Sequence, residues 1–190
     1  VSKRDRHSLD KDVLLYFAVA SAAQDAFIAA WESKRFYDSS RPWTLIHHCF
    51  AGKTIKGWGG PDKGTVEIKG EQWHPFSPSV FVTPPFPGYV SGHSCVSACC
   101  AKVLEHFTGS DHFGAIEVRQ CCVLTETGGE TVKLDLPTFS GTAEMAGLSR
   151  IMGGYHIAAD NIAGLKLGRD VAETVWAKAK ACIAGTGLPG

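Results

Sequence analysis

Hydrophobic residues recur every three to four positions in four stretches of the chain, and this spacing predicts amphipathic helices. The longest stretch, residues 12–35, contains few helix-breaking residues and carries large apolar side chains from Val13 to Trp31. Gly109 follows the second stretch, and glycine is favoured just beyond a helix C-terminus. We therefore expect four main helices, at residues 12–35, 91–107, 142–150 and 160–182.

Two regions depart from helical spacing. Residues 52–90 contain the clusters GWGGPDKG and TPPFPG and six of the nine prolines, which predicts a long irregular segment with short helical or extended pieces. Such a segment either covers a functional site or simply crosses the surface. Residues 116–124 and 131–136 are rich in β-branched side chains and flank Gly128-Gly129, so a small β-hairpin is expected there.

Length and composition fit one compact domain. The 190 residues are 44% apolar, which is enough for a buried core, and we treat residues 1–190 as a single domain. The 19 basic residues balance the 19 acidic ones, which disfavours nucleic acid as a partner and makes any anion site local. The longest apolar run, residues 13–20, is too short to span a bilayer, so no membrane span is expected.

Seven cysteines are present, without a CxxC pair. Cys95 and Cys99 lie one turn apart in a stretch expected to be buried, where cysteine packs as a small apolar residue. This spacing does not suit a zinc site. One or two disulfides stay open, for example through the adjacent Cys121 and Cys122, because connectivity cannot be read from sequence.

Two polar segments carry candidate anion-binding chemistry. KRFYDSSRP places Lys34 and Arg41 with six residues between them. PPFPGYVSGHS brings the Ser91 hydroxyl, the Gly92 amide and His93 to a helix N-terminus, where free N–H groups and the helix dipole favour an anion. Taken singly, each feature also fits a structural role, such as a solvated lysine or a turn glycine.

A third segment, SRIMGGYHIAAD, adds an arginine, a histidine and an aspartate. Gly153-Gly154 should end the helix that carries Arg150, so His156 opens the next one. His156 and Asp160 then lie one turn apart, where a carboxylate can fix the imidazole tautomer and raise its basicity. A surface or capping pair has the same spacing, so this segment indicates a functional site only in combination with the other two segments.

Together the three segments supply three cations, a hydroxyl, a backbone amide, two histidines and a carboxylate. Such a set can hold a tetrahedral or trigonal-bipyramidal oxyanion. His156, oriented by Asp160, is the candidate to bond its central atom, and His93 is the candidate acid/base on the opposite side. A module that only binds anions would need the cations and the amide but not these histidines.

The order and spacing of these segments, over about residues 25–169, resemble the vanadium-dependent haloperoxidases. The resemblance extends to the superfamily of type-2 phosphatidic-acid phosphatases and bacterial acid phosphatases. It implies an all-α helical bundle of the haloperoxidase/acid phosphatase type, here with long loops and a small β-hairpin. His156 would be the covalent ligand of vanadate, with catalysis by His93, His156, Lys34 and Asp160 and oxyanion contacts from Lys34, Arg41, Ser91, Gly92, Arg150 and His156.

Two aromatic residues separate the branches of this superfamily. Trp31 lies three residues before Lys34, and Phe86 lies seven residues before His93. Aromatic residues at both places resemble chloroperoxidase-type members and imply a halide site, although both also fit ordinary core positions. We therefore expect a vanadium-dependent haloperoxidase that uses hydrogen peroxide to oxidise halide to hypohalous acid. The alternative is an acid phosphatase that hydrolyses phosphate monoesters with His156 as the nucleophile.

The chain departs from the family pattern in two respects. Val90 stands where proline usually precedes the Ser-Gly-His element. Haloperoxidases of this type resemble two stacked bundles in a longer chain, so we expect this to be the C-terminal catalytic half of a longer protein. It would associate with the N-terminal part of the same protein and expose a broad apolar surface without it. A secreted or extracytoplasmic location is expected, and an organic substrate and a homo-oligomer stay open.

Overall fold

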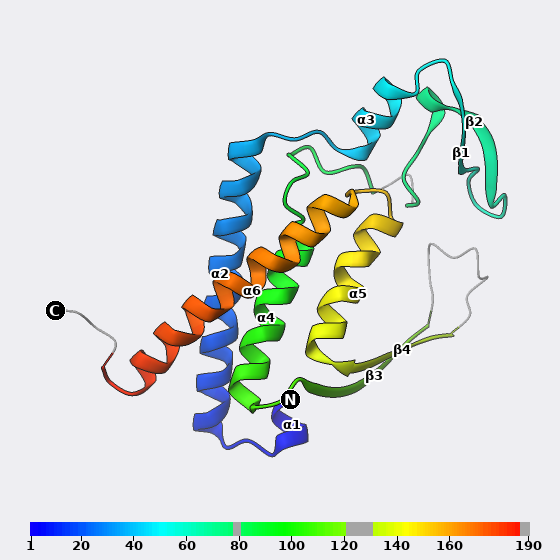
Figure 1. Cartoon of the computed structure of the whole chain (residues 1–190). Coiled ribbons are helices and arrows are strands. Elements are labelled where there is room, and N and C mark those ends of the chain that lie inside the picture. Colours follow the sequence, from blue (N-terminus) through cyan, green and yellow to red (C-terminus); the bar gives the residue numbers. More distant parts are fainter. Residues whose placement is uncertain (78–80, 121–130, 187–190) are drawn as a thin grey trace.

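Four long helices dominate the computed structural model, which describes residues 1–77, 81–120 and 131–186 (Figure 1). Two short helices, α1 (Ser2–Asp5) and α3 (Pro42–Cys49), accompany them. The all-α fold expected from the spacing of apolar residues is confirmed. The long helices are α2 (Leu9–Tyr37), α4 (Gly92–Thr108), α5 (Phe139–Met152) and α6 (Ala158–Ile183).

Capping residues explain why α2 and α5 begin earlier than their apolar patterns predict. The Ser8 hydroxyl accepts a hydrogen bond from the Lys11 amide, so α2 starts at Leu9. The Thr138 hydroxyl accepts from the Gly141 amide at 3.0 Å, so α5 starts at Phe139. Polar caps extend a helix beyond the residues that bury an apolar face, and hydrophobic spacing alone does not detect this extension.

Helix α2 faces the bundle through a stripe of alanines. Their spacing of four places them on one face, and their small side chains let α4 approach closely. The thiols of Cys95 and Cys99 donate hydrogen bonds to the carbonyl groups of Ala26 and Ala22 at 3.5 and 3.4 Å. These two cysteines are therefore buried in the core as predicted, against the fully buried residues Ala18, Ala22, Ala26 and Ala30.

Helices α4 and α6 pack still more closely, because glycines of α6 face the α4 backbone. A Cβ atom on Gly168 would lie 2.1 Å from the Cys95 carbonyl oxygen, and one on Gly164 would lie 2.6 Å from that of Ser91. No side chain fits in either space. The first turn of α4 and the start of α6 are thus held together, and both carry candidate site residues.

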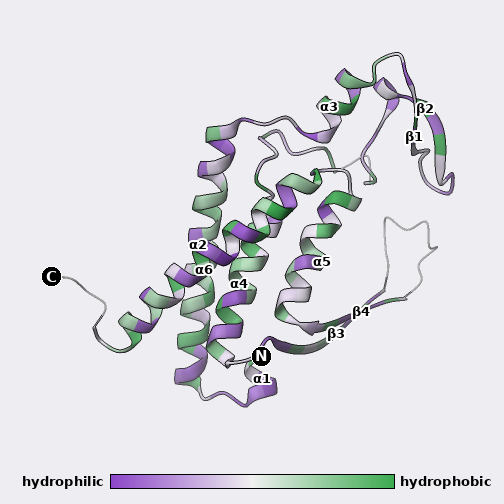
Figure 2. Ribbon diagram, viewed as in Figure 1, coloured by the Kyte–Doolittle hydropathy of each residue, from purple (hydrophilic) through white to green (hydrophobic). Residues whose placement is uncertain are grey.

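Most large apolar residues of α2 are exposed, although Leu15 is buried, and Figure 2 shows hydrophobic residues recurring along this helix. Phe17, Phe27, Ile28 and Trp31 are each about half exposed or more. These exposed side chains are compatible with the broad apolar surface that the sequence analysis predicts, which stays a prediction. A window within Leu9–Cys49 also meets the length and hydropathy criteria for a membrane-crossing helix, with 28% of it buried, but core helices meet the same criteria.

Two antiparallel hairpins complete the fold. Strands β1 (Thr54–Trp58) and β2 (Thr65–Lys69) pair within the region that the sequence predicts as irregular with short extended pieces. Strands β3 (His112–Gln120) and β4 (Thr131–Thr138) form the second hairpin, which the sequence predicted. The Gly128-Gly129 turn and the Cys121-Cys122 pair lie outside the described residues.

The remaining described cysteines do not share one environment. Cys49 and Cys182 are exposed, and Cys100 is partly buried, so packing explains Cys95 and Cys99 but not the two exposed thiols. All five described cysteines are free thiols. Cysteine chemistry therefore contributes nothing to the candidate site among the described residues.

Candidate active site

A cavity of about 250 Å³ lies where the end of α2, the start of α4 and the junction of α5 and α6 meet. Eight of the ten residues singled out in the sequence line it. Ser91 and Asp160 lie behind the lining, where both are buried. The predicted residues that line the cavity are Trp31, Lys34, Arg41, Phe86, Gly92, His93, Arg150 and His156.

His156 is buried, and hydrogen bonds to both ring nitrogens fix its tautomer. Its Nδ1 lies 2.9 Å from the Asp160 carboxylate, and its Nε2 lies 3.0 Å from Nη1 of Arg41. Arginine can only donate, so Nε2 accepts and the proton resides on Nδ1. Burial lowers the pKa of His156, and Arg41 lowers it further, while the Asp160 hydrogen bond opposes this shift. His156 thus presents the lone pair of Nε2 to the cavity.

Asp160 positions this histidine from the first turn of α6. His156 lies one residue before Ile157, the N-cap of α6, so His156 and Asp160 do not share a helical face as the sequence suggested. The Asp160 carboxylate also accepts from the Ile157 amide at 3.3 Å. The Asp160 carbonyl accepts from the Ser91 amide at 2.9 Å, which joins the start of α6 to the start of α4.

Two of the three cations are anchored by backbone carbonyl groups. Lys34 donates to the Pro87 and Gly88 carbonyls at 2.8 and 2.9 Å. Burial, with the nearby charge of Arg41, lowers the pKa of Lys34 to about 8. Arg41 donates through Nε to the Phe86 carbonyl and through Nη1 to the Tyr155 carbonyl.

Among the described residues, the buried Nε of the third cation, Arg150, has no hydrogen-bond partner. Its guanidinium group lies over the Tyr155 ring at 4.4 Å, and burial lowers its pKa. Within the residues that the structure describes, none of the three cations forms an ion pair with a carboxylate. Buried charges and donors are ordinarily paired, so the cluster fits an anion in the cavity.

The start of α4 contributes Ser91 and Gly92 to the site. The Ser91 hydroxyl accepts a hydrogen bond from the Ser94 amide as the helix cap, and its own proton stays available for donation. A Cβ on Gly92 would meet no atom closer than Lys34 Cε at 4.0 Å, so the space above this glycine is open to a ligand. The helix N-terminus therefore faces the cavity with room for an oxygen atom.

The other predicted residues form the outer walls. His93 is exposed at the cavity, and its pKa is lowered by partial burial and then by the charge of Arg150. The rings of Trp31 and Phe86 are 4.8 Å apart. The Phe86 ring also lies 5.5 Å from Lys34 Nζ and 5.0 Å from the Arg41 guanidinium carbon, so the two aromatic residues border the cation cluster. A halide-binding role for them stays a prediction.

The sequence analysis missed a buried polar contact beneath the site. The Ser94 hydroxyl donates to Oδ1 of Asn161 at 2.6 Å, and Gly147 of α5 leaves room for this amide, since a Cβ there would lie 2.2 Å from Oδ1. The contact ties α4 to α6 one residue beyond Asp160. The signal was present in Asn161, a polar residue on the face of α6 that also carries Gly164 and Gly168.

The comparisons with known proteins agree with the helical-bundle fold described above. Residues 14–185 match the VCPO second helical-bundle domain. A holo-type bacterial vanadium-dependent chloroperoxidase is 24% identical with a TM-score of 0.77, over 86% of this chain and 35% of that one. An apo-type bacterial vanadium-dependent chloroperoxidase is 23% identical with a TM-score of 0.81, over 92% of this chain and 37% of that one. A bacterial vanadium-dependent iodoperoxidase is 27% identical with a TM-score of 0.66, over 92% of this chain and 35% of that one. This chain thus spans little more than a third of those proteins, and no curated protein matches it.

Proposed function

The chain belongs to the family of VCPO second helical-bundle domains, and from this premise we propose that it carries the catalytic site of a vanadium-dependent haloperoxidase. The reaction would use hydrogen peroxide to oxidise halide to hypohalous acid. One observation carries the proposal: a buried histidine nitrogen that can only accept faces a cavity shared with three cations that have no carboxylate partner in the described part of the chain. This donor set fits vanadate, a tetrahedral oxyanion whose metal binds imidazole nitrogen.

Each residue at the cavity would have a separate role in holding vanadate. Vanadate, when bound, supplies the metal centre that activates peroxide. His156 would hold it through Nε2, while Asp160 keeps the proton on Nδ1. Arg41 now donates to Nε2, so it would turn that donor to an oxyanion oxygen once Nε2 bonds the metal. Arg150 would satisfy its unpaired Nε in the same way.

His93 and Lys34 are placed to handle protons and charge. Because its pKa is lowered, His93 is neutral at pH 7 and can accept a proton at the cavity. Lys34, with a pKa of about 8, is mostly protonated at pH 7 and can donate hydrogen bonds to bound oxygens. Ser91 and Gly92 would add a hydroxyl and an amide donor at the start of α4.

Histidine-dependent phosphatase activity is the second candidate function, and the same Nε2 lone pair supports it. His156 would then attack phosphorus, and His93 would protonate the leaving alcohol. The Trp31–Phe86 wall favours halide chemistry, because phosphate ester hydrolysis does not require an aromatic surface at the cations.

Reconstitution separates the two activities. Metal-free protein should gain peroxide-dependent bromide oxidation when vanadate is added, and phosphate should compete because both oxyanions would use the same cations. The hydrolysis of a phosphate monoester is measured on the same preparation, without added metal. Efficient metal-free phosphatase turnover together with no vanadate-dependent bromide oxidation would overturn the proposal.

The pKa of Lys34 predicts how anion binding depends on pH. Sulfate is a suitable probe because its charge is constant from pH 7 to pH 10. Its affinity should fall as the pH rises above about 8, by up to about tenfold per pH unit, because the free protein then loses the Lys34 charge. His93 and His156 have lowered pKa values and do not titrate in this range. Titration calorimetry measures the affinity, and Lys34→Met should remove the pH dependence; a flat profile for the unsubstituted protein would contradict the role of Lys34.

We further propose that the outer face of α2 packs against another part of a longer protein. The support is its exposed apolar side chains, including Phe17, Phe27 and Ile28, and the small share of the similar solved proteins that this chain spans. The mass of the intact protein from its source should therefore exceed the 20.4 kDa of this chain. A mass equal to that of residues 1–190 would contradict this proposal.

A further inference from the structure

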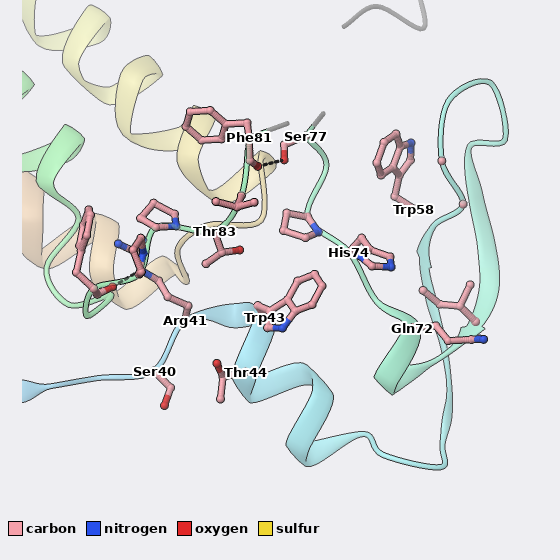
Figure 3. A pocket seen from close by; sticks show the side chains of 18 of the residues that line it. Ser40, Arg41, Trp43, Thr44, Trp58, Gln72, His74, Ser77, Phe81 and Thr83 are labelled. Carbon is pink, nitrogen blue, oxygen red and sulfur yellow. Dashed lines mark hydrogen bonds between the residues drawn. The ribbon is translucent and has the colours of Figure 1, made fainter. Parts of the chain in front are cut away.

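The oxyanion cavity is open on one side and packed against helices on the other. Towards α3 and the β1–β2 hairpin it adjoins a cleft of about 1,400 Å³, and Figure 3 shows Arg41 at the border of this cleft. Arg41, Pro84 and Phe86 line both spaces. An open cleft cannot hold donor groups at fixed positions, so their precise placement depends on the packed side, where α4, α5 and α6 meet.

These three helices meet at one buried polar contact. The Ser94 hydroxyl of α4 donates to Oδ1 of Asn161 of α6 at 2.6 Å, and both residues are buried. Gly147 of α5 lies against this contact. A Cβ on Gly147 would lie 2.2 Å from Oδ1 of Asn161 and 3.0 Å from the Ser94 hydroxyl oxygen. Glycine on α5 thus leaves room for the amide, and the hydrogen bond gives the crossing one preferred arrangement.

Each of the three helices carries a candidate site residue within one turn of this contact. A shift of one helix at the contact would therefore move its donor group relative to the groups on the other two. The site residues concerned are Ser91 and Gly92 at the start of α4, Arg150 near the end of α5, and Asp160, which holds His156, in the first turn of α6.

Two hydrogen bonds join the start of α4 to the start of α6. The Ser91 amide donates to the Asp160 carbonyl at 2.9 Å, and the bond from Ser94 to Asn161 lies one turn further along α4. One bond alone would let α4 pivot about it, whereas two bonds one turn apart fix the direction of the helix. The close packing at Gly168 holds the helices together without a directional bond. Direction matters because hydrogen bonds to an oxyanion weaken steeply when distance and angle depart from their preferred values.

We propose that Asn161 is a positioning residue of this site. Through Ser94, it fixes the direction in which α4 presents the Ser91 hydroxyl and the Gly92 amide to the oxyanion. Asn161 acts from behind the lining of the cavity and does not touch the anion. An apolar side chain of the same size would fill the space but would not set this direction, because apolar contacts are non-directional. The role in anion binding stands by itself, whereas a role in halide oxidation rests on the proposed function.

Three variants separate positioning from packing: Asn161→Leu, Ser94→Ala and the double variant. Titration calorimetry with sulfate at pH 7, without vanadate or peroxide, should show about tenfold weaker binding for each, because all three lack the directional bond. The melting temperature should fall most for Ser94→Ala, which leaves the Asn161 amide buried without its partner. It should recover in the double variant, where both polar groups are absent, while the sulfate affinity stays low.

Thr142→Val is the matched control. It removes a hydroxyl that donates to the Thr138 carbonyl at 2.7 Å, at the end of α5 away from Arg150, and it should leave sulfate affinity unchanged. A sulfate affinity that recovered together with the melting temperature in the double variant would show that the contact contributes packing only, and would overturn the proposal. Unchanged affinity in Asn161→Leu would also overturn it, as would the absence of sulfate binding by the unsubstituted protein.

The proposed function is measured separately, as vanadate-dependent oxidation of iodide to triiodide by the same proteins. Weaker sulfate binding by the variants without iodide oxidation by the unsubstituted protein would support the positioning role and overturn the haloperoxidase proposal. If the unsubstituted protein oxidises iodide, Asn161→Leu should raise the vanadate concentration needed for half-maximal oxidation about tenfold, the low end of the usual cost of disturbing the support of a metal site. An unchanged vanadate requirement would contradict the positioning role.

Discussion

Replacing His156 with alanine is expected to lower vanadate affinity and vanadate-dependent bromide oxidation by at least about 10- to 100-fold each, the usual cost of disturbing a metal ligand or its support. The substitution removes the only cavity-facing lone pair on this ring, which Arg41 identifies as an acceptor. The cations stay in place, because carbonyl groups anchor Lys34 and Arg41 independently of the imidazole. Weak, purely electrostatic anion binding should therefore survive.

The measurements are vanadate binding followed by ⁵¹V NMR and bromide oxidation at saturating peroxide. His106→Ala is the matched control, since His106 stacks on Trp176 and pairs with Glu173 at the surface, away from the cavity. It should match the unsubstituted protein in both measurements. If His156→Ala retained full affinity and activity, the assignment of Nε2 as the metal-binding atom would be wrong.

The convergence of the site could be predicted because its residues are tied to helix ends. Lys34 closes α2, Gly92 opens α4 and Arg150 closes α5, and such ends are marked in sequence by proline, glycine and capping residues. The packing of α4 against α2, α5 and α6 then brings these ends together. The direct Arg41–His156 hydrogen bond and the unpaired Arg150 Nε could not be predicted, since both depend on side-chain placement within a few tenths of an ångström.

The buried face of α2 could not be predicted from apolar residue size. Large apolar residues such as Phe17, Phe27 and Ile28 dominate the pattern, yet four of the six buried positions of α2 are alanines, because a close helix contact leaves room only for small side chains. Alanine is weakly hydrophobic and common on exposed helix faces, so the stripe gives little signal of its own. The pairing of β1 with β2 was missed because strands of five residues among glycines and prolines offer too few alternating positions to predict a hairpin.

Replacing Asp160 with asparagine tests the tautomer of His156 without removing the imidazole. The carboxylate accepts the Nδ1 proton at 2.9 Å, and this leaves Nε2 as a lone pair. Asparagine has nearly the same shape but offers an amide that can donate to Nδ1, which would move the proton to Nε2 and block bonding there. The equivalent aspartate-to-asparagine change in a serine protease triad costs about 10⁴ in kcat through the wrong tautomer. We expect vanadate-dependent oxidation to fall by about 10²- to 10⁴-fold, with vanadate affinity falling in parallel.

Folding should tolerate this change, because an amide turned toward Nδ1 gives up only the 3.3 Å bond from the Ile157 amide, which shares Oδ2 with His156, and the Asp160 carbonyl that accepts from Ser91 belongs to the backbone. Thermal unfolding monitors stability, and NMR of ¹⁵N-labelled histidine reports which nitrogen of His156 carries the proton. Asp170→Asn is the matched control, since Asp170 pairs with Lys166 on the exposed face of α6. A folded Asp160→Asn protein with the proton still on Nδ1 and undiminished oxidation would show that the carboxylate does not set the state of His156. Loss of oxidation together with a proton moved to Nε2 would show that the activity depends on the Nε2 lone pair. A general loss of packing would lower the activity without moving this proton.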